Sequence, residues 1–132
     1  MYSRYLLDSS ILIGFDENRL LQEHKTVLAS IEKGEAIGFI HTLVVLEYAY
    51  FSVKQMSLRE FSKRISQFYL IDVDLEDAYN AAQVLKEAEK EGISLSLSDA
   101  LTIYYAKKMK VPIVSLKDNI REYASKIGLK VI

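Results

Sequence analysis

Short apolar segments alternate along this chain with segments in which apolar residues recur every three or four positions. Short, nearly continuous apolar runs favour buried strands, whereas the three- and four-residue spacing is typical of helices. The pattern predicts strands at residues 2–7, 36–40, 69–73, 111–115 and 128–132. Because helical segments separate these strands, we expect an α/β fold with a parallel sheet that is covered on both faces.

The helical pattern has recognisable start and stop residues. Ser9 or Ser10 can cap the first helix and Thr42 a later one, while Gly34 and Gly92 follow helix ends. The predicted helices span residues 11–15, 18–33, 42–54, 58–68, 75–91, 100–110 and 119–126, the sixth opened by Ser98 or Asp99. In parallel sheets, ligands bind beyond the carboxyl ends of the strands, so functional residues are expected there.

Composition narrows the class of protein. A chain of 132 residues, half of them hydrophobic and 27% charged, is expected to fold as one globular domain spanning residues 1–132. It has no cysteine and two histidines, which excludes disulfides, zinc–thiolate sites and multi-histidine metal sites. No apolar run approaches 18 residues, and Asp8 interrupts the stretch that a signal peptide would need. We therefore expect a cytoplasmic protein without a membrane span.

The net charge of −1 is unevenly distributed. Residues 93–132 hold seven basic and three acidic side chains, whereas residues 72–91 hold seven acidic side chains and two lysines. A basic C-terminal third suits an anionic partner, although a solvated charged surface would give the same pattern. The basic residues Arg59, Lys63 and Arg64 are expected on one helix face, where they could neutralise phosphates.

Four carboxylates lie in or beside apolar sequence. Asp8 ends the first predicted strand, and Glu47 interrupts residues 43–51, of which the other eight are apolar. Asp99 opens an apolar helix, and Asp118 follows the strand at 111–115. Burying an unpaired carboxylate costs several kcal/mol, so each of these four side chains requires a partner.

Taken singly, each carboxylate has a structural explanation. Asp99 could be a helix N-cap, Asp8 a turn residue, and Asp118 could stabilise a helix N-terminus. Glu47 lies in the middle of a predicted helix and so cannot cap it, which makes a buried ion pair its structural explanation. Taken together, converging carboxylates would repel one another, and a divalent cation would remove that conflict. Oxygen ligands favour Mg²⁺ or Mn²⁺, which can orient a phosphodiester and activate a bound water.

Several of these residues stand in a familiar order. They are Asp8-Ser9-Ser10 after a strand, Thr42 with Glu47 five residues on, Leu97-Ser98-Asp99-Ala100, and a strand followed by Ser115-x-x-Asp118. With the order of predicted elements, they resemble the PIN domain, and by size the VapC-type toxin ribonucleases of toxin–antitoxin pairs. The resemblance covers nearly the whole chain.

The resemblance implies a three-layer α/β/α sandwich with a five-stranded parallel sheet. It also implies a hydrolase, a Mg²⁺- or Mn²⁺-dependent endoribonuclease with an RNA substrate, a cognate antitoxin protein and a homodimeric state. The catalytic, metal-binding carboxylates would be Asp8, Glu47 and Asp99, with Asp118 as the fourth. The hydroxyls of Ser10, Thr42 and Ser115 would position ligands or water.

One segment departs from the family pattern, which has Thr-x-Asp after the fourth strand. Here Lys117 stands in the acidic position, and Asp118 comes one residue later. We expect a sharp turn at residues 116–118 that brings Asp118 inward and leaves Lys117, with Arg121, to contact the RNA backbone. The alternative is that the lysine fills the fourth position. The corresponding alternative function is a weakly active or inactive PIN domain that binds RNA or protein.

Overall fold

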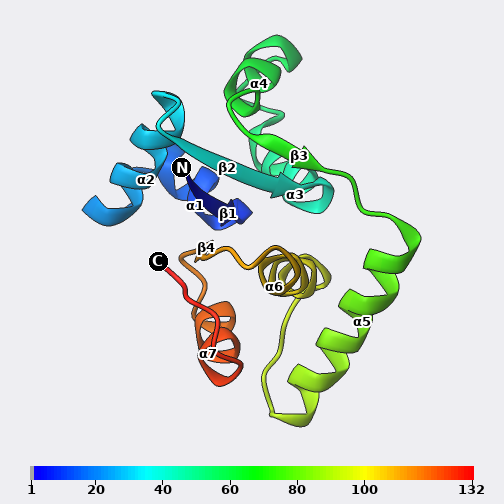
Figure 1. Ribbon diagram of the computed structural model, residues 1–132. Helices are drawn as coiled ribbons and strands as arrows, with labels where there is room; N and C mark the ends of the chain where they lie inside the picture. Colours follow the sequence, from blue (N-terminus) through cyan, green and yellow to red (C-terminus); the bar gives the residue numbers. More distant parts are fainter. Residues whose placement is uncertain (1) are drawn as a thin grey trace.

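The computed structural model describes residues 2–132, which form an α/β fold around a four-stranded, fully parallel sheet (Figure 1). The strands are β1 (Ser3–Leu7), β2 (Ala36–His41), β3 (Tyr69–Ile71) and β4 (Ile113–Val114). Their order across the sheet is β3-β2-β1-β4. The predicted parallel sheet is confirmed.

Helices cover both faces of the sheet. They are α1 (Ser9–Asp16), α2 (Gln22–Glu32), α3 (Thr42–Ser52), α4 (Leu58–Ile65), α5 (Leu75–Lys90), α6 (Leu97–Met109) and α7 (Asp118–Lys126). Neighbouring residues of β1 point to opposite faces, as strand geometry requires. Leu6 therefore joins a core with α5, α6 and α7, and Leu7 joins a second core with α1, α2 and α3. These two cores confirm the three-layer sandwich.

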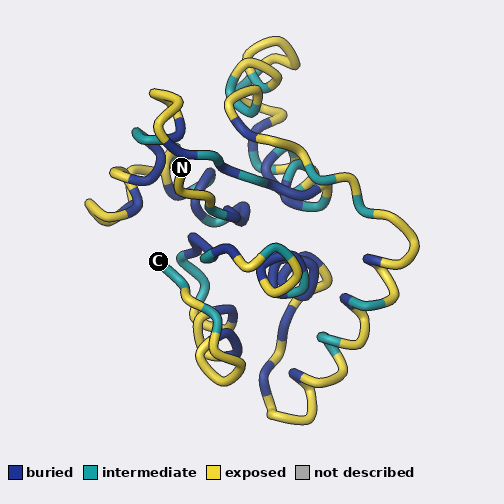
Figure 2. Tube along the Cα trace, in the orientation of Figure 1, coloured by how far each residue is buried: buried dark blue, intermediate teal, exposed yellow. Residues whose placement is uncertain are grey.

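The outermost helices contribute least to the cores. Figure 2 shows mostly exposed turns along α4 and the outer side of α5, whereas α6 is buried along most of its length. None of the residues of α4 is fully buried, and eight residues of α6 are. No helix within residues 2–132 is long and apolar enough to cross a membrane.

The prediction of five strands is wrong. The final segment makes a single isolated bridge, Ile113 with Val131, beside β4. Because β4 itself has only two residues, it offers a partner segment too little backbone for a longer ladder. The final segment is nevertheless held by backbone hydrogen bonds from Ile113 to Lys130 and from Ile132 to Ile113.

Three helix starts also differ from the prediction. The N-cap of α1 is Asp8, whose carboxylate accepts a hydrogen bond from the Ser10 backbone, and not Ser9 or Ser10. The N-cap of α3 is His41, and Thr42 is already its first helical residue. The N-cap of α6 is Ser96, and Asp99 lies three residues further on, where its carboxylate accepts a hydrogen bond from the Ser96 backbone. The Ser96 hydroxyl in turn accepts from the Asp99 backbone, which completes a capping box.

A buried carboxylate joins α5 to α6. Asp77 accepts hydrogen bonds from the hydroxyls of Tyr105 at 2.6 Å and Tyr104 at 3.0 Å, and it pairs with Lys108 at 3.2 Å. Burial raises the pKa of Asp77, but these hydrogen bonds outweigh it and hold the pKa below its ordinary value. This link holds α6, whose first turn carries Asp99.

We expect Asp77→Asn to lower the free energy of unfolding by about 1–3 kcal/mol, because an amide cannot accept from both tyrosines and pair with Lys108. Urea denaturation at neutral pH measures this effect. Glu76→Gln, at the exposed neighbouring position, is the matched control and should change stability by less than about 0.5 kcal/mol. Equal stability of the two variants would contradict a structural role for Asp77.

Candidate active site

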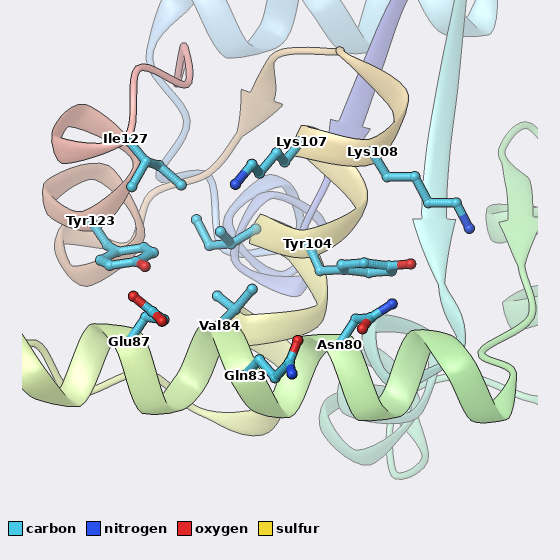
Figure 3. A pocket seen from close by; sticks show the side chains of 10 residues that line it. Asn80, Gln83, Val84, Glu87, Tyr104, Lys107, Lys108, Tyr123 and Ile127 are labelled. Carbon is cyan, nitrogen blue, oxygen red and sulfur yellow. The ribbon is translucent and has the colours of Figure 1, made fainter.

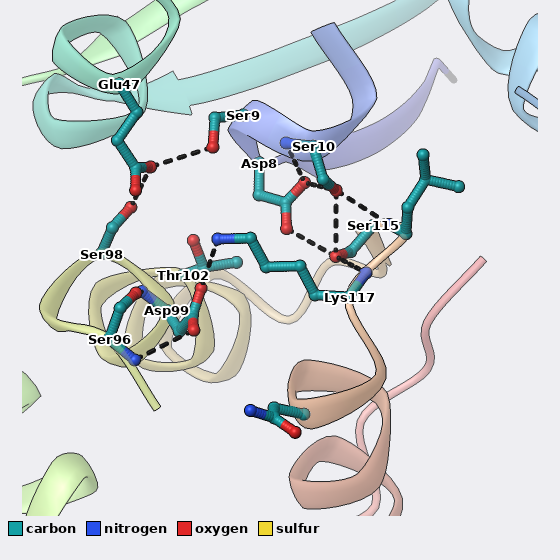
Figure 4. Close-up of polar contacts among 12 residues, drawn as sticks. Asp8, Ser9, Ser10, Glu47, Ser96, Ser98, Asp99, Thr102, Ser115 and Lys117 are labelled. Atoms are coloured by element: carbon teal, nitrogen blue, oxygen red, sulfur yellow. Dashed lines mark hydrogen bonds and ion pairs between the residues drawn. The ribbon is translucent and has the colours of Figure 1, made fainter. Parts of the chain in front are cut away.

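The end of β1 lies beside the end of β4. Leu7 pairs with Val114, so the residues that follow, Asp8 and Ser115, emerge side by side. The Ser115 hydroxyl donates to Asp8 Oδ2 at 2.5 Å. Ser10, in the first turn of α1, donates to Asp8 Oδ1 from its backbone at 3.0 Å and from its hydroxyl at 2.5 Å (Figure 4). Both oxygens of Asp8 are thus fixed in position.

The environment of Asp8 disfavours its negative charge. The residue is 1% exposed, and burial raises its pKa above the ordinary value. Hydrogen bonds from Ser10 and Ser115 and the positive charge of Lys117 oppose this effect without cancelling it. A cation close to Asp8 would therefore stabilise the charged form.

Glu47 reaches the same region from α3. Its Oε1 atom accepts hydrogen bonds from the hydroxyls of Ser98 at 2.8 Å and Ser9 at 3.0 Å. Within residues 2–132 no Lys, Arg or His lies within 4.0 Å of its carboxylate, so the buried ion pair that was its structural alternative is not formed. Sequence reasoning missed Ser9 and Ser98 as partners, although both adjoin predicted acidic residues.

Lys117 enters the cluster between the carboxylates (Figure 4). Its Nζ atom lies 2.8 Å from Asp99 Oδ1, while Asp99 Oδ2 accepts from the Ser96 backbone at 3.0 Å. Burial lowers the pKa of Lys117, but the bond to Asp99 and the charges of Asp99, Asp8 and Glu47 raise it above its ordinary value. The cluster therefore contains three carboxylates and one ammonium group.

The expectation that Asp118 turns inward is wrong. Lys117 has extended backbone angles of φ −85° and ψ 123°, and α7 begins only at Asp118. In an extended segment, residues two apart point to the same side, so Lys117 follows Ser115 into the cluster. Leu116 packs against the opposite core, and Asp118 is exposed.

Two other predicted site residues make backbone contacts instead. The Thr42 hydroxyl donates to the Ile71 carbonyl at 3.1 Å, at the end of β3. The Arg121 guanidinium donates to the carbonyls of Ser115 and Val131, both at 3.2 Å. Arg121 thus ties the final segment to the end of β4. Of the predicted hydroxyl residues, Ser10 and Ser115 are joined to the carboxylate cluster.

Arg64, which was expected to meet phosphates, and Lys108 both pair with carboxylates of the protein itself. Arg64 on α4 pairs with Asp16, the last residue of α1, and also donates to the Tyr48 hydroxyl at 3.3 Å. Tyr48 is buried and donates to Asp16 at 2.5 Å. Lys108 pairs with Asp77. These contacts hold helices together and take the side chains away from the cluster.

A cavity of about 600 Å³ lies between α5, α6 and α7 (Figure 3). Tyr104, Lys107 and Lys108 line it from α6, and Tyr123 lines it from α7. None of the site carboxylates lines this cavity. The basic residues in the second half of α6 therefore face a different part of the molecule from Asp99.

The structure buries His41 completely at the end of β2. Its Nε2 atom lies 3.0 Å from the Thr102 hydroxyl and 3.2 Å from the Ser98 carbonyl. Burial lowers its pKa to about 4. His41 therefore links the sheet to the start of α6 and helps to position Ser98 and Asp99.

Comparison with known proteins identifies the fold family. The model of the PIN domain family matches residues 5–126. The chain belongs to the PIN domain family. No curated protein sequence matches it.

Solved structures share the fold at low sequence identity. One is a chain of the VapBC2 complex from Rickettsia felis, which is bound to a DNA fragment of its promoter. That chain is 14% identical in sequence, the match covers 98% of this PIN domain and 97% of that chain, and the TM-score is 0.72. A toxin–antitoxin complex from Klebsiella pneumoniae is 20% identical, with coverage of 97% and 95% and a TM-score of 0.72. VapC20 of Mycobacterium tuberculosis, a sarcin-ricin loop cleaving toxin, is 11% identical, with coverage of 89% and 93% and a TM-score of 0.65.

The donor atoms of this PIN domain fit Mg²⁺ or Mn²⁺ in their chemistry. Asp8, Glu47 and Asp99 offer carboxylate oxygens, the ligands that both ions prefer. As arranged here, no three acidic or histidine side chains among residues 2–132 come close enough to enclose one ion. The Lys117 side chain instead extends between Asp8 and Asp99 and pairs with Asp99 (Figure 4).

The burial of His41 predicts a pH dependence of stability. Its folded pKa of about 4 lies below the ordinary 6.5, so the folded state binds fewer protons than the unfolded state between these values. Stability should therefore fall as the pH drops from 6.5 towards 4, by up to about 1.4 kcal/mol per pH unit. His41→Gln should flatten this slope in urea denaturation, whereas the exposed control Asp118→Asn should keep it. An unchanged slope in His41→Gln would refute this assignment.

The contacts of Glu47 predict a small effect of neutralising it. In metal-free protein, Glu47→Gln should change the free energy of unfolding by less than about 1 kcal/mol, because the amide oxygen still accepts from both serines and no cation loses its partner. Asp99→Asn is the matched comparison and should cost about 1–3 kcal/mol, because it leaves Lys117 without its partner. Thermal unfolding in a chelator compares the two, and a larger loss for Glu47→Gln would contradict the contacts described.

Proposed function

We propose that this PIN domain is a Mg²⁺- or Mn²⁺-dependent endoribonuclease and the toxin of a toxin–antitoxin pair. The observation that carries the proposal is that Asp8, Glu47 and Asp99, which come from three different parts of the chain, lie at the same carboxyl edge of the sheet. Structural relatives that include toxin–antitoxin complexes and a loop-cleaving toxin support the same class.

Asp8, Glu47 and Asp99 are the residues that would hold the ion. When bound, a divalent ion supplies a water of lowered pKa and stabilises negative charge at the phosphorus centre. Hydrolysis would form a new P–O bond to the oxygen of water and break the bond to the leaving oxygen, while the water releases one proton to solvent and the leaving oxygen takes up one proton from solvent. No side chain has to form a covalent intermediate in this scheme.

The serines around the cluster act as positioning residues. Ser10 and Ser115 hold Asp8, and Ser9 and Ser98 hold Glu47. All four hydroxyls donate to carboxylates, and none of these bonds joins a serine to a histidine that could activate it as a nucleophile. Their role is to keep the carboxylate oxygens in place, which lowers the reorganisation required when the substrate binds.

The proposed partners are RNA, a cognate antitoxin and a second copy of the chain. RNA would enter at the acidic edge of the sheet. Exposed large apolar side chains support a protein partner, since such surface favours burial. They include Leu46 and Tyr50 on α3 and Leu75 and Tyr79 on α5, each more than 60% exposed.

One observation favours a second candidate function. Lys117 pairs with Asp99 and so neutralises one of the three carboxylates. A chain in which this pair persists would bind RNA or protein without cleaving it. Binding that weakens with salt, without cleavage, is the behaviour expected of such a module.

A nuclease assay distinguishes the two functions. We expect the wild type to cleave single-stranded or looped RNA in the presence of Mn²⁺ or Mg²⁺, and a chelator to abolish cleavage. Glu47→Gln should reduce cleavage by at least about 100-fold, because a charged ligand is lost while the fold is kept. The exposed Glu122→Gln is the control and should cleave like the wild type.

Two results would contradict the proposed nuclease. One is salt-sensitive RNA binding by the wild type without metal-dependent cleavage, which would favour the binding module. The other is full activity of Glu47→Gln, which would remove Glu47 from the catalytic site.

A further inference from the structure

The most unusual feature of the acidic edge is the lysine inside it. Lys117 Nζ donates to Asp99 at 2.8 Å, and the charges of Asp8 and Glu47 also act on it. No other basic side chain among residues 2–132 pairs with any of these three carboxylates. Among residues 2–132, Lys117 is therefore the cation that pairs with this cluster, through Asp99.

The position of Lys117 conflicts with a bound divalent cation. The ammonium group and a metal ion would both be attracted to Asp99, and they would repel each other at close range. The same three carboxylates also fail to converge on one point while the lysine lies between them. A metal ion that binds here thus has to displace the ammonium group.

The local structure allows this displacement without refolding. The backbone of Lys117 is anchored, because its N–H donates to the Ser115 hydroxyl at 3.0 Å and it forms the N-cap of α7. Its side chain is 30% exposed, so its flexible four-carbon stem has a route to solvent by rotation alone. The Ser115 hydroxyl continues to hold Asp8 whichever way the side chain of Lys117 points.

We propose that Lys117 is a tethered counter-ion that competes with the divalent cation, so that metal binds only when Lys117 leaves Asp99. This inference rests on the proposed function for the identity of the site as a metal site. Its consequence is that the metal-free protein is stable and its carboxylates are partly neutralised, while its affinity for metal is reduced by its own side chain.

Metal binding measured without substrate tests this proposal. Calorimetric titration with Mn²⁺ alone compares the wild type with Lys117→Met, which keeps the apolar stem and removes the charge. We expect Lys117→Met to bind Mn²⁺ at least about tenfold more tightly. Lys117→Arg, which keeps the charge, should bind as weakly as the wild type. Lys107→Met, at an exposed position lining the cavity between α5, α6 and α7, should also match it.

Thermal unfolding provides a second readout. In a chelator, Lys117→Met should melt below the wild type, because the three carboxylates lose their counter-ion and repel one another. Addition of Mn²⁺ should raise its melting temperature by more than that of the wild type. Lys117→Gln repeats the test with a polar side chain in case the methionine variant folds poorly.

The outcomes separate this inference from the proposed function. If both proteins bind Mn²⁺ with equal affinity, the carboxylates form a metal site but Lys117 does not compete for it, and the inference is overturned alone. If neither protein binds Mn²⁺, the cluster is not a metal site, and the metal-dependent nuclease is overturned with it. Tighter binding by Lys117→Met but not by Lys117→Arg supports competition by charge.

Discussion

The parallel pairing of β1 with β4 is the constraint on which the site depends. It places Asp8 and Ser115 side by side, and their hydrogen bond closes the end of the sheet. Burial there makes the charge of Asp8 costly, so everything that surrounds it has to donate hydrogen bonds or supply positive charge. The hydroxyls of Ser10 and Ser115 donate these hydrogen bonds, and the ammonium group of Lys117 supplies the positive charge.

The protein satisfies its buried carboxylates in two different ways. Asp77 is surrounded by two tyrosine hydroxyls and a lysine, which hold its pKa low, and it serves to join two helices. The carboxylates at the sheet edge have serine partners, and Asp99 alone of the three pairs with a lysine, Lys117. Asp77 is therefore a structural carboxylate, whereas the edge cluster retains an excess of negative charge that a cation or a basic partner can neutralise.

The position of α6 connects these two groups. Asp77 holds its second half, through Tyr104 and Tyr105, and His41 holds its first turns, through the Ser98 carbonyl and Thr102. Burial lowers the pKa of this histidine to about 4. The geometry of the acidic edge consequently depends on contacts that lie outside it.

Hydrophobic periodicity was sufficient to predict the layers, since strands buried on both faces are apolar throughout. Asp8, Glu47 and Asp99 were identifiable because a carboxylate in apolar sequence requires compensation wherever it lies. The prediction of a fifth strand was wrong because a strand can pair only along the residues of its neighbouring strand, and β4 has two residues. Apolar character alone carries no information on that length.

The sequence by itself determined the parallel α/β fold and the acidic residues that meet at its edge, because apolar spacing and misplaced charges are local properties. Tertiary structure decided the partners of those residues. The backbone at Lys117 stays extended, so a lysine rather than Asp118 enters the cluster. His41 became a buried link, and Arg64 turned to Asp16, because the elements that satisfy them are distant in sequence and meet only in the folded chain.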